Sequence, residues 1–435
     1  RQMQRTTKLV TALGALAIVV GACGAGASPS AVPATEAPSA EAPTATPAPE
    51  YPTGDFKIRL WTKEGEADGA FQFVTKLTDA YTALHPNVTF EVTNKDVEAL
   101  REDFQTASLA GDAPEVLWTV ADHIGPFTAA DLILPLDDMV DKAGFVPAAA
   151  DIVTVDGTLW GAPTSFGNQL MLLWDKSKYG DTAPVDSDAW IAKARELTDG
   201  TNYGIVFNQT ESFWLVPFLG GFGGSVFAED GVTPTLDTDA MKSALQFMYD
   251  LKYTDKVMPS EADYNVADGL FKDGKAASII NGDWTLGAYA EVLGDKLGVG
   301  PLPKLTGYDY PKPYIAGTFL MASKAVGDNP DLKTIVSDFM TFATNTANQV
   351  DMVKTLKRLP GNAAALADPI VTGDPLLAGA ADAATKGVPQ PTNLEMRCVF
   401  DSMTAGVRDM FTGNSDIAGI AATMQSGSET CISQL

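Results

Sequence analysis

Strands and helices are predicted to alternate along the first part of the chain, and this order limits the possible folds more than any other feature. Period-two alternation predicts strands at 56–61 and 88–92, and the short segment Glu115-Val116-Leu117-Trp118 is predicted as a third strand at 115–118. Apolar residues at three- and four-residue spacing predict helices between them, at 71–81 and 97–110. This is the order of an α/β unit with a mainly parallel sheet, whose ligands bind beyond the carboxyl ends of the strands.

A second α/β unit is predicted farther along the chain. Extended apolar segments come first, and helices and strands then alternate again until the last 75 residues, which are rich in helical patterns. The predicted strands are 158–163, 170–174, 203–207 and 276–280, and the predicted helices are 190–197, 238–251 and 266–272. The chain is long enough for two domains of ordinary size.

The N-terminus carries an export signal. An apolar run at 9–22 follows three cations and is too short to span a bilayer, which takes about 20 residues. The residues Val20-Gly21-Ala22-Cys23 resemble a bacterial lipobox, so we expect a signal peptide at 1–22 and a lipid on Cys23. The alternative is an ordinary secretory peptide with an incidental cysteine. With the lipid, the protein would be anchored to the outer face of the bacterial cytoplasmic membrane.

A linker is predicted at 23–54. Residues 24–52 contain seven prolines and nine alanines among Ser, Thr and Glu, a composition that cannot bury enough apolar surface to fold. The segment would then tether a folded body that contacts the membrane through its lipid only. A disordered tail without lipid would have the same composition.

Charge and cysteine content exclude several classes of function. The formal net charge of −25 argues against binding nucleic acid or anionic lipid surfaces. With two histidines and no clustered cysteines, we expect no metal and no cofactor. No serine or cysteine lies in a recognisable nucleophile motif. In an oxidising compartment Cys398 and Cys431 would form a disulfide, the alternative being two buried thiols.

Several phrases, taken in order, resemble one family. They are 57–61 (KIRLW), 111–118 (GDAPEVLW), 157–163 (GTLWGAP), 174–176 (WDK), 271–277 (FKDGKAA), 281–284 (NGDW) and 394–400 (LEMRCVF). The ordered set resembles the extracellular solute-binding proteins of ABC sugar importers, in the branch that includes maltose-binding protein. The resemblance covers nearly all of residues 55–425.

The resemblance implies a two-lobed α/β fold with the ligand in a cleft between discontinuous lobes. It implies a non-enzymatic monomer that captures a sugar, closes, and delivers the sugar to the permease subunits of an ABC importer. The expected first lobe combines 55–165 with 319–360, and the second combines 168–315 with 362–435. The chain would cross between the lobes at 164–168, 315–319 and 358–362.

The resemblance also implies which residues bind the ligand. Sugars stack their C–H faces on aromatic rings, and polar side chains bond the hydroxyl groups at the edge. Trp284 and Phe400 match stacking positions, although the second is usually Trp in the family. Glu211 matches a hydroxyl-binding carboxylate and Phe213 an aromatic cap. In the first lobe Trp61 and Trp118 match two tryptophans, and Asp122 lies near an acidic position. Each of these tryptophans could instead be a half-buried packing residue.

The sequence departs from the maltose pattern at its polar positions. Lys63 and Glu64, or Glu66, stand where the family has an Asp-Lys pair, and Asn168 or Gly167 replaces a glutamate. The sequence therefore retains more of the family's stacking aromatic residues than of its polar ligand contacts. This favours a carbohydrate, of which a maltodextrin-type oligosaccharide is the first candidate.

Two other classes of function remain open from the sequence. The same fold could bind a polyol, a glycerophosphodiester or a peptide. A carbohydrate-active enzyme would need two carboxylates about 5 Å or 6.5 to 9.5 Å apart across one glycosidic bond. The sequence offers many acidic residues but singles out no such pair.

Overall fold

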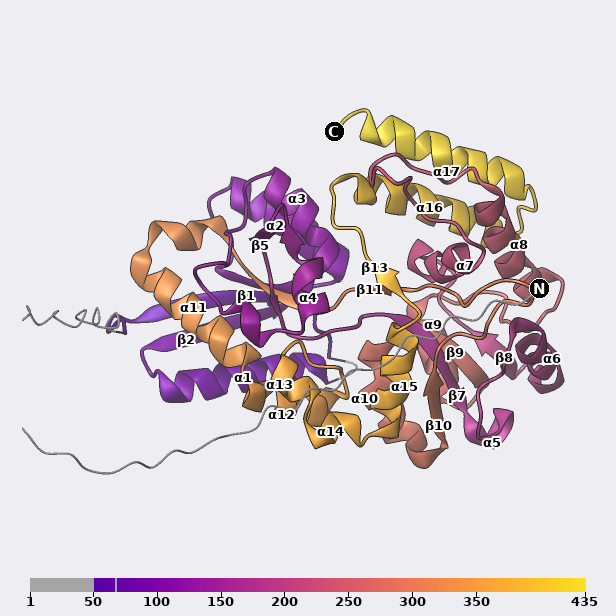
Figure 1. The fold of residues 1–435 in the computed structure, drawn as a ribbon, viewed down its shortest axis with the longest axis horizontal. Coiled ribbons are helices and arrows are strands. Elements are labelled where there is room, and N and C mark those ends of the chain that lie inside the picture. The colour runs from indigo at the N-terminus through magenta and orange to yellow at the C-terminus, as the bar shows by residue number, and fades with distance from the viewer. Residues whose placement is uncertain (1–50, 67–68) are drawn as a thin grey trace, which may run out of the picture. The chain divides into compact units, whose positions relative to one another are not determined.

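The first sheet in the chain has the strand order β2-β1-β3-β12-β6. The computed structural model describes residues 51–66 and 69–435, which include this sheet (Figure 1). Strand β1 (Phe56–Thr62) pairs in parallel with β2 (Val88–Asn94) and with β3 (Val116–Val120). The predicted strand, helix, strand order is confirmed here, with α1 (Ala70–Leu84) and α2 (Val97–Leu109) as the two helices between the strands.

The sheet is mixed, whereas we expected it to be mainly parallel. Strand β12 (Thr318–Ala322) pairs antiparallel with β3 and with β6 (Ala162–Pro163). Because β12 lies almost 200 residues after β3 in the sequence, the local order of elements around 56–118 contains no sign of it. Strand order within a sheet depends on where the chain returns.

We call the first sheet and the elements that pack against it the first lobe. Its core combines the buried face of α1 with side chains from α2, α3 (Ile124–Ala129), α11 (Pro330–Thr344) and α12 (Thr346–Leu356). Tyr81 in α1 is fully buried, and its ring meets Phe339 of α11 edge to face at 5.3 Å. Residues more than 250 positions apart in sequence therefore share one core.

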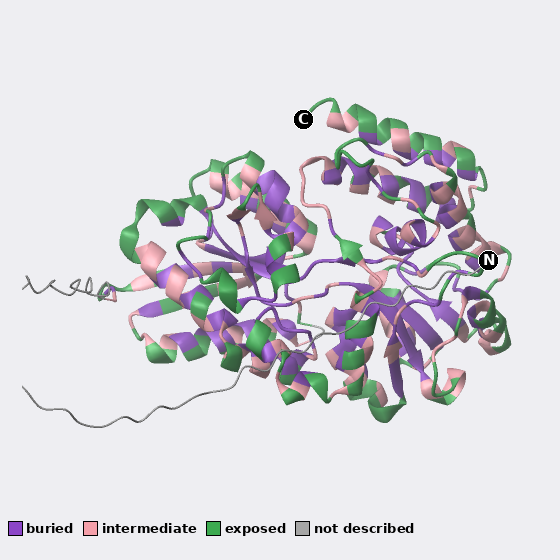
Figure 2. Ribbon diagram, viewed as in Figure 1, coloured by how far each residue is buried: buried purple, intermediate pink, exposed green. Residues whose placement is uncertain are grey.

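The second lobe packs around the sheet β10-β7-β9-β8. Strand β7 (Leu170–Asp175) pairs antiparallel with β9 (Ala276–Gly282) and β10 (Leu297–Gly300), and β8 (Tyr203–Val206) pairs in parallel with β9. Every residue of β7 and β9 is buried, as Figure 2 shows by the purple strands. Strands covered on both faces are largely apolar, and the polar residues that these two strands contain are Asp175, Ser278 and Asn281.

Helices from distant parts of the chain cover the second sheet. The core contains the apolar faces of α6 (Ser187–Leu197), α8 (Asp239–Tyr253), α16 (Glu395–Phe411) and α17 (Ile417–Ile432). A disulfide joins Cys398 of α16 to Cys431 of α17, with their Cα atoms 5.5 Å apart. The remaining helices of the second lobe are α5 (Lys176–Tyr179), α7 (Val216–Gly221), α9 (Tyr264–Lys272), α10 (Leu286–Leu293), α13 (Ala363–Leu366), α14 (Pro369–Thr372) and α15 (Pro375–Ala384).

The segments that pass between the two cores lie beside one another. Ser165 forms a bridge with Pro360, and Gly167 forms one with Ala316. Thr164 and Ser165 also bond the hydroxyl of Thr318, at 2.8 and 2.9 Å. Near them β11 (Tyr314–Ile315) pairs with β13 (Val388–Pro389).

Short elements complete the described part of the chain. They are α4 (Pro147–Ile152), β4 (Thr154–Val155), β5 (Thr158–Leu159) and the 3-10 turns η1 (Ala121–His123), η2 (Lys142–Gly144), η3 (Ser212–Trp214), η4 (Asp283–Thr285), η5 (Gly294–Lys296) and η6 (Lys324–Asp328). Over residues 51–66 and 69–435, no helix is both long and apolar enough to span a bilayer. The predicted signal peptide and Cys23 lie outside the described residues.

Candidate functional site

A cleft of about 650 Å³ lies where strands of both lobes end. Its walls include residues that follow β1 and β3 in the first lobe and β8 and β9 in the second, together with α16. Four strand ends thus supply one site, as expected for ligands of α/β sheets. The predicted residues that line the cleft are Lys63, Glu64, Asp122, Asn168, Glu211, Phe213, Trp284 and Phe400.

Trp284 is positioned by a glycine two residues before it. The ring lies over the backbone of Gly282, where a Cβ atom would fall 1.9 Å from ring carbon Cζ3. Only glycine leaves room for the ring to fold back on the end of β9. The indole Nε1 donates a hydrogen bond to the Tyr264 hydroxyl at 2.9 Å, which fixes the ring plane. The motif Asn-Gly-Asp-Trp therefore holds the tryptophan in the lining of the cleft.

Further aromatic rings continue this wall. The ring of Phe213 lies 6.4 Å from that of Trp284, centroid to centroid, and Trp214 lies 6.2 Å from Tyr264. Trp214 itself is buried and donates a hydrogen bond from Nε1 to the carbonyl of Ile280 at 2.9 Å. Phe400, from α16, lines the same cleft. The second lobe thus offers a series of apolar faces rather than a single ring.

A buried ion pair lies at the base of the cleft. Glu64 accepts a hydrogen bond from Arg358 at 2.7 Å, and both residues are almost completely buried. Burial opposes ionisation of Glu64, but Arg358 and Lys63 outweigh it and hold the pKa of this carboxyl below its ordinary value. The Lys63 ammonium lies 3.6 Å from the same carboxyl group. Glu64 is therefore a carboxylate, held by two cations.

Two other carboxyl groups in the cleft are shifted in the opposite direction. Burial raises the pKa of Asp122 to about 6, and the nearby charge of Glu98 adds to this effect. The Glu211 carboxyl is accessible to water but lies within the cleft, where desolvation raises its pKa as well. Hydrogen-bond donors on a ligand would stabilise the ionised forms of these two carboxyl groups, which burial disfavours.

Trp61 and Trp118, which were also expected to bind ligand, do not line the cleft. Trp118 is buried in the first core, where its ring meets Phe73 edge to face at 6.5 Å. Trp61 is half-buried, and the Lys95 ammonium lies 4.2 Å from its ring centroid. Position at a strand end does not decide which face of the sheet a side chain takes, because alternate residues point to opposite faces.

Several lining residues were not predicted from the sequence. Tyr264 and Lys272 come from α9, Arg397 and Arg408 from α16, and Gln390 from the segment after β13. The phrase Leu394-Glu395-Met396-Arg397 had pointed to α16 through the resemblance, so its cationic neighbours could have been included. Tyr264 has no comparable signal in the sequence.

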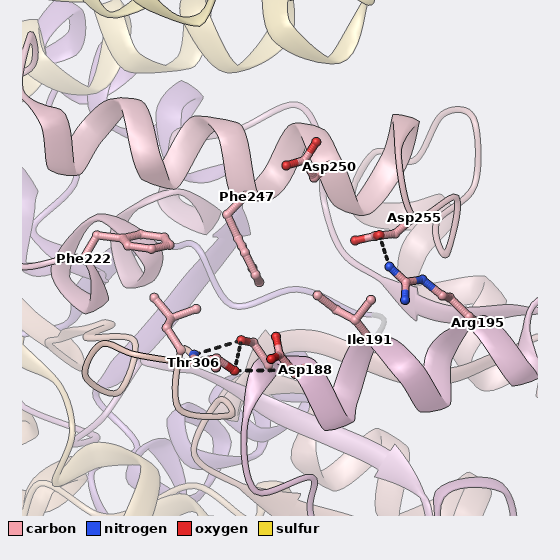
Figure 3. A pocket seen from close by; sticks show the side chains of 10 residues that line it. Asp188, Ile191, Arg195, Phe222, Phe247, Asp250, Asp255 and Thr306 are labelled. Atoms are coloured by element: carbon pink, nitrogen blue, oxygen red, sulfur yellow. Dashed lines mark hydrogen bonds and ion pairs between the residues drawn. The ribbon is translucent and has the colours of Figure 1, made fainter.

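A second cavity, of about 360 Å³, lies between α6 and α8 in the second lobe. Figure 3 shows the rings of Phe222 and Phe247 beside it and the ion pair of Arg195 with Asp255 at one end. It contains none of the residues expected to bind ligand. Within residues 51–66 and 69–435 there is also no group of three or more side chains that could hold a metal ion.

Fold and site together define a two-lobed binding protein whose ligand cleft lies between the lobes. The family model for bacterial extracellular solute-binding proteins matches residues 76–379, and the chain belongs to that family. Its members are exported binding proteins.

Solved structures and characterised relatives agree with this assignment. The maltose/maltodextrin-binding domain from Bdellovibrio bacteriovorus, bound to maltotriose, is 30% identical, with a TM-score of 0.82 over 87% of this chain and all of that one. A maltotriose-binding protein of Thermus thermophilus, also with maltotriose, gives a TM-score of 0.79 at 24% identity over 86% of this chain and all of that one. The maltotriose-binding protein of Pyrococcus abyssi is 24% identical over 384 residues, 86% of this chain and 82% of the relative.

Proposed function

We propose that this protein captures an oligosaccharide in the cleft and delivers it to the membrane permease of an ABC importer. The observation that carries the proposal is the aromatic wall formed by Trp284, Phe213 and Phe400. Sugar rings carry C–H groups on their faces and hydroxyls at their edges, so they stack on such a wall while polar residues bond the edges. Asp122, Glu211 and Asn168 supply acceptors and an amide for those hydroxyls.

The charge pattern of the cleft supports a neutral ligand. Three of its cations already have carboxylate partners: Lys63 with Glu64, Lys272 with Asp268 at 2.9 Å, and Arg397 with Asp401 at 2.7 Å. A fourth, Arg408, donates to the carbonyl of Thr210 at 2.8 Å. An anion such as a glycerophosphodiester would have to compete for these cations, whereas a sugar would not.

Relatives support the malto-oligosaccharide class. Two similar proteins of known structure hold maltotriose, and the 30% identity to one of them extends over 87% of the chain. The polar positions of the maltose pattern are only partly kept. We therefore assign maltodextrin-type oligosaccharides as the first class to test, with galacto-oligosaccharides second, since a galactooligosaccharide-binding protein of Bacillus subtilis is 23% identical over 83% of the chain and 86% of the relative.

We further propose that the two lobes move about the three crossings at 164–168, 315–319 and 358–362. The lobe boundaries would then be 55–165 with 319–360 and 168–315 with 362–435. The core around the first sheet is separate from the core that α8, α16 and α17 form on the second, and this separation and the bridges between adjacent crossings support the division. Ligand contacts made by both lobes at once would favour the closed state.

The anchored state is part of the same proposal. A lipid on Cys23 and the linker at 23–54 would keep a monomeric receptor near its permease, on the outer face of the membrane. One relative of this family is a maltooligosaccharide solute-binding lipoprotein of Streptococcus pneumoniae, 22% identical over 80% of this chain and 83% of the relative. We propose no enzymatic activity. Release of reducing ends during long incubation with oligosaccharide would contradict this part.

A ligand screen tests the proposal. Maltotriose, other maltodextrins, galacto-oligosaccharides, sugar alcohols, a glycerophosphodiester and a peptide library are added in turn, and the melting temperature is measured. A ligand at 100 times its Kd stabilises the folded state by about 2.7 kcal/mol, so a binder is readily seen. Stabilisation by the anion or peptide, with none by any sugar, would exclude the sugar assignment.

The aromatic wall is tested with one substitution and a matched control. Trp284→Ala removes the ring and is expected to cost about 2 kcal/mol or more of binding free energy, roughly thirtyfold in Kd. Tyr308→Ala also removes an aromatic side chain, but one that is 54% exposed and does not line the cleft, so it leaves Kd unchanged. Calorimetry with the best sugar gives both values, and equal affinity of the two variants would remove Trp284 from the site.

A further inference from the structure

One contact between the lobes depends on a glycine. Gly125 lies in α3, whose neighbours Ile124 and Phe127 belong to the first core. A Cβ atom on Gly125 would fall 2.3 Å from the carbonyl oxygen of Thr392 and 2.9 Å from the backbone nitrogen of Leu394. These are backbone atoms, which cannot turn aside as the end of a flexible side chain can. Figure 1 shows the segment that carries them leading from β13 into α16.

The segment 392–394 belongs to the other lobe. It leads into α16, whose Met396, Val399 and Met403 are buried in the second core. The Asn393 amide also donates a hydrogen bond to Gly231 at 3.2 Å, within the same lobe. We call the contact of Gly125 with 392–394 the seat. Each side of the seat is fixed to its own lobe, so the seat forms or separates when the lobes move.

An ion pair lies across the lobes beside the seat. Glu98, in α2 of the first lobe, accepts a hydrogen bond from Arg397 in α16. Glu98 is also 3.4 Å from Arg101 on its own helix, and Arg397 is 2.7 Å from Asp401 on its own. Both side chains are partly exposed, so the pair is screened by salt and contributes modestly. It nevertheless shows that α2 and α16 face each other in this arrangement.

We propose that Gly125 controls closure of the cleft, because only a residue without a side chain lets α3 sit directly on 392–394. Gly125 does not line the cleft, so it acts on affinity through the population of the closed state rather than by touching sugar. The seat and the ion pair consist of protein atoms alone, so they hold a share of the molecules closed before sugar arrives. The identity of the sugar rests on the proposed function; the seat does not.

Adding one methyl group at position 125 tests the contact with 392–394 directly. In Gly125→Ala the methyl meets the carbonyl of Thr392 only when the lobes are closed, so the open state is unaffected. Gly125 precedes Pro126, and a Cβ atom before proline disfavours the helical conformation, so the substitution also costs α3 some stability of its own. Gly144→Ala is the matched control, since it lies in the same lobe, has no atom within 4 Å of the added Cβ and needs no positive φ.

The experiment measures both affinity and closure. Affinity for maltotriose is measured by calorimetry, and we expect Gly125→Ala to bind about tenfold more weakly or worse while Gly144→Ala binds as the unchanged protein does. Closure is measured without sugar, by the distance between spin labels on Leu109→Cys and Val185→Cys in the full chain carrying Cys23→Ser. These two positions are 85% and 76% exposed. We expect longer distances in Gly125→Ala than in Gly144→Ala.

The spin-label distances measured without sugar decide whether the seat controls closure. Equal spin-label distances in the two variants would overturn the seat, whatever the sugar affinity. If the unchanged protein fails to bind maltotriose, the proposed function fails there, while the sugar-free distances still test the seat.

Discussion

The ring of Trp284 can fold back over β9 only because Gly282 has no side chain. The prediction that follows concerns a residue that does not line the cleft itself. Gly282→Ala leaves the tryptophan in place but pushes its ring off the strand, and we expect the affinity for sugar to fall by about tenfold or more. Gly269→Ala, in α9 of the same lobe, adds a methyl group with no atom within 4 Å and serves as control. Calorimetry compares the two, and an unchanged Kd for Gly282→Ala would contradict the packing argument.

Loss of Arg358 is expected to lower the free energy of unfolding. Arg358→Met leaves the buried Glu64 carboxylate with Lys63 as its remaining close cation, at 3.6 Å. Breaking one side of a buried pair typically costs about 3–5 kcal/mol. Chemical denaturation measures this loss. The double variant Arg358→Met/Glu64→Gln removes the orphaned charge and is expected to recover a large part of it. A double variant no more stable than the single one would show that packing, and not charge, is the cause.

Asp283 should make stability depend on pH. Burial raises its pKa to about 6, and although Arg358 and Lys63 act against this, Glu64 adds to it. The folded state then holds a proton that the unfolded state has released, so the free energy of unfolding falls as pH rises from about 4 to about 6. Glu64, whose pKa is lowered, acts in the opposite sense, and its contribution is lost only at lower pH. Asp283→Asn should flatten the profile between about pH 4 and pH 6 in urea unfolding. An unchanged slope would assign it to another group, such as Asp122.

At the scale of elements, the disulfide joins the last two helices. Cys398 and Cys431 are 33 residues apart, and a cross-link of this span stabilises by about 3–4 kcal/mol in the chain-entropy account. The double variant Cys398→Ser/Cys431→Ser should lose an amount of this size in guanidinium denaturation. Reduction of the unchanged protein with dithiothreitol should give the same loss. If it does not, the serine hydroxyls, one of them at a buried position, are responsible instead.

Which elements exist was predictable, but how they are ordered in the sheets was not. Local periodicity indicated β1, α1, β2, α2 and β3 to within three residues, because each buries one face against its neighbours. The antiparallel entry of β12 depends on contacts between residues more than 150 positions apart in the sequence, which periodicity does not record.

The same limit applies to the candidate site. The rings of Trp284, Phe213 and Phe400 were identified through the resemblance, whereas Trp118 failed to reach the cleft because its side chain points into the core.

At the scale of the whole molecule, the proposed tether gives a direct test. Cys23→Ser removes the predicted lipid attachment and is expected to move the protein from the membrane fraction to the soluble exported fraction, while its sugar affinity is unchanged. Metabolic labelling with a radioactive fatty acid, followed by fractionation, measures this. Label retained in Cys23→Ser, or membrane association without label, would contradict the lipoprotein assignment.

Strand β12 has a consequence for how the protein is made. It occupies an inner position of the first sheet, between β3 and β6, yet it is synthesised about 200 residues after β3. The first sheet therefore cannot be completed while the N-terminal third of the chain is emerging from the ribosome, and closing so long a loop slows folding further. A chain that folds late stays extended for longer, and an extended chain is what passage through a narrow export channel, as the predicted signal peptide at 1–22 implies, would require.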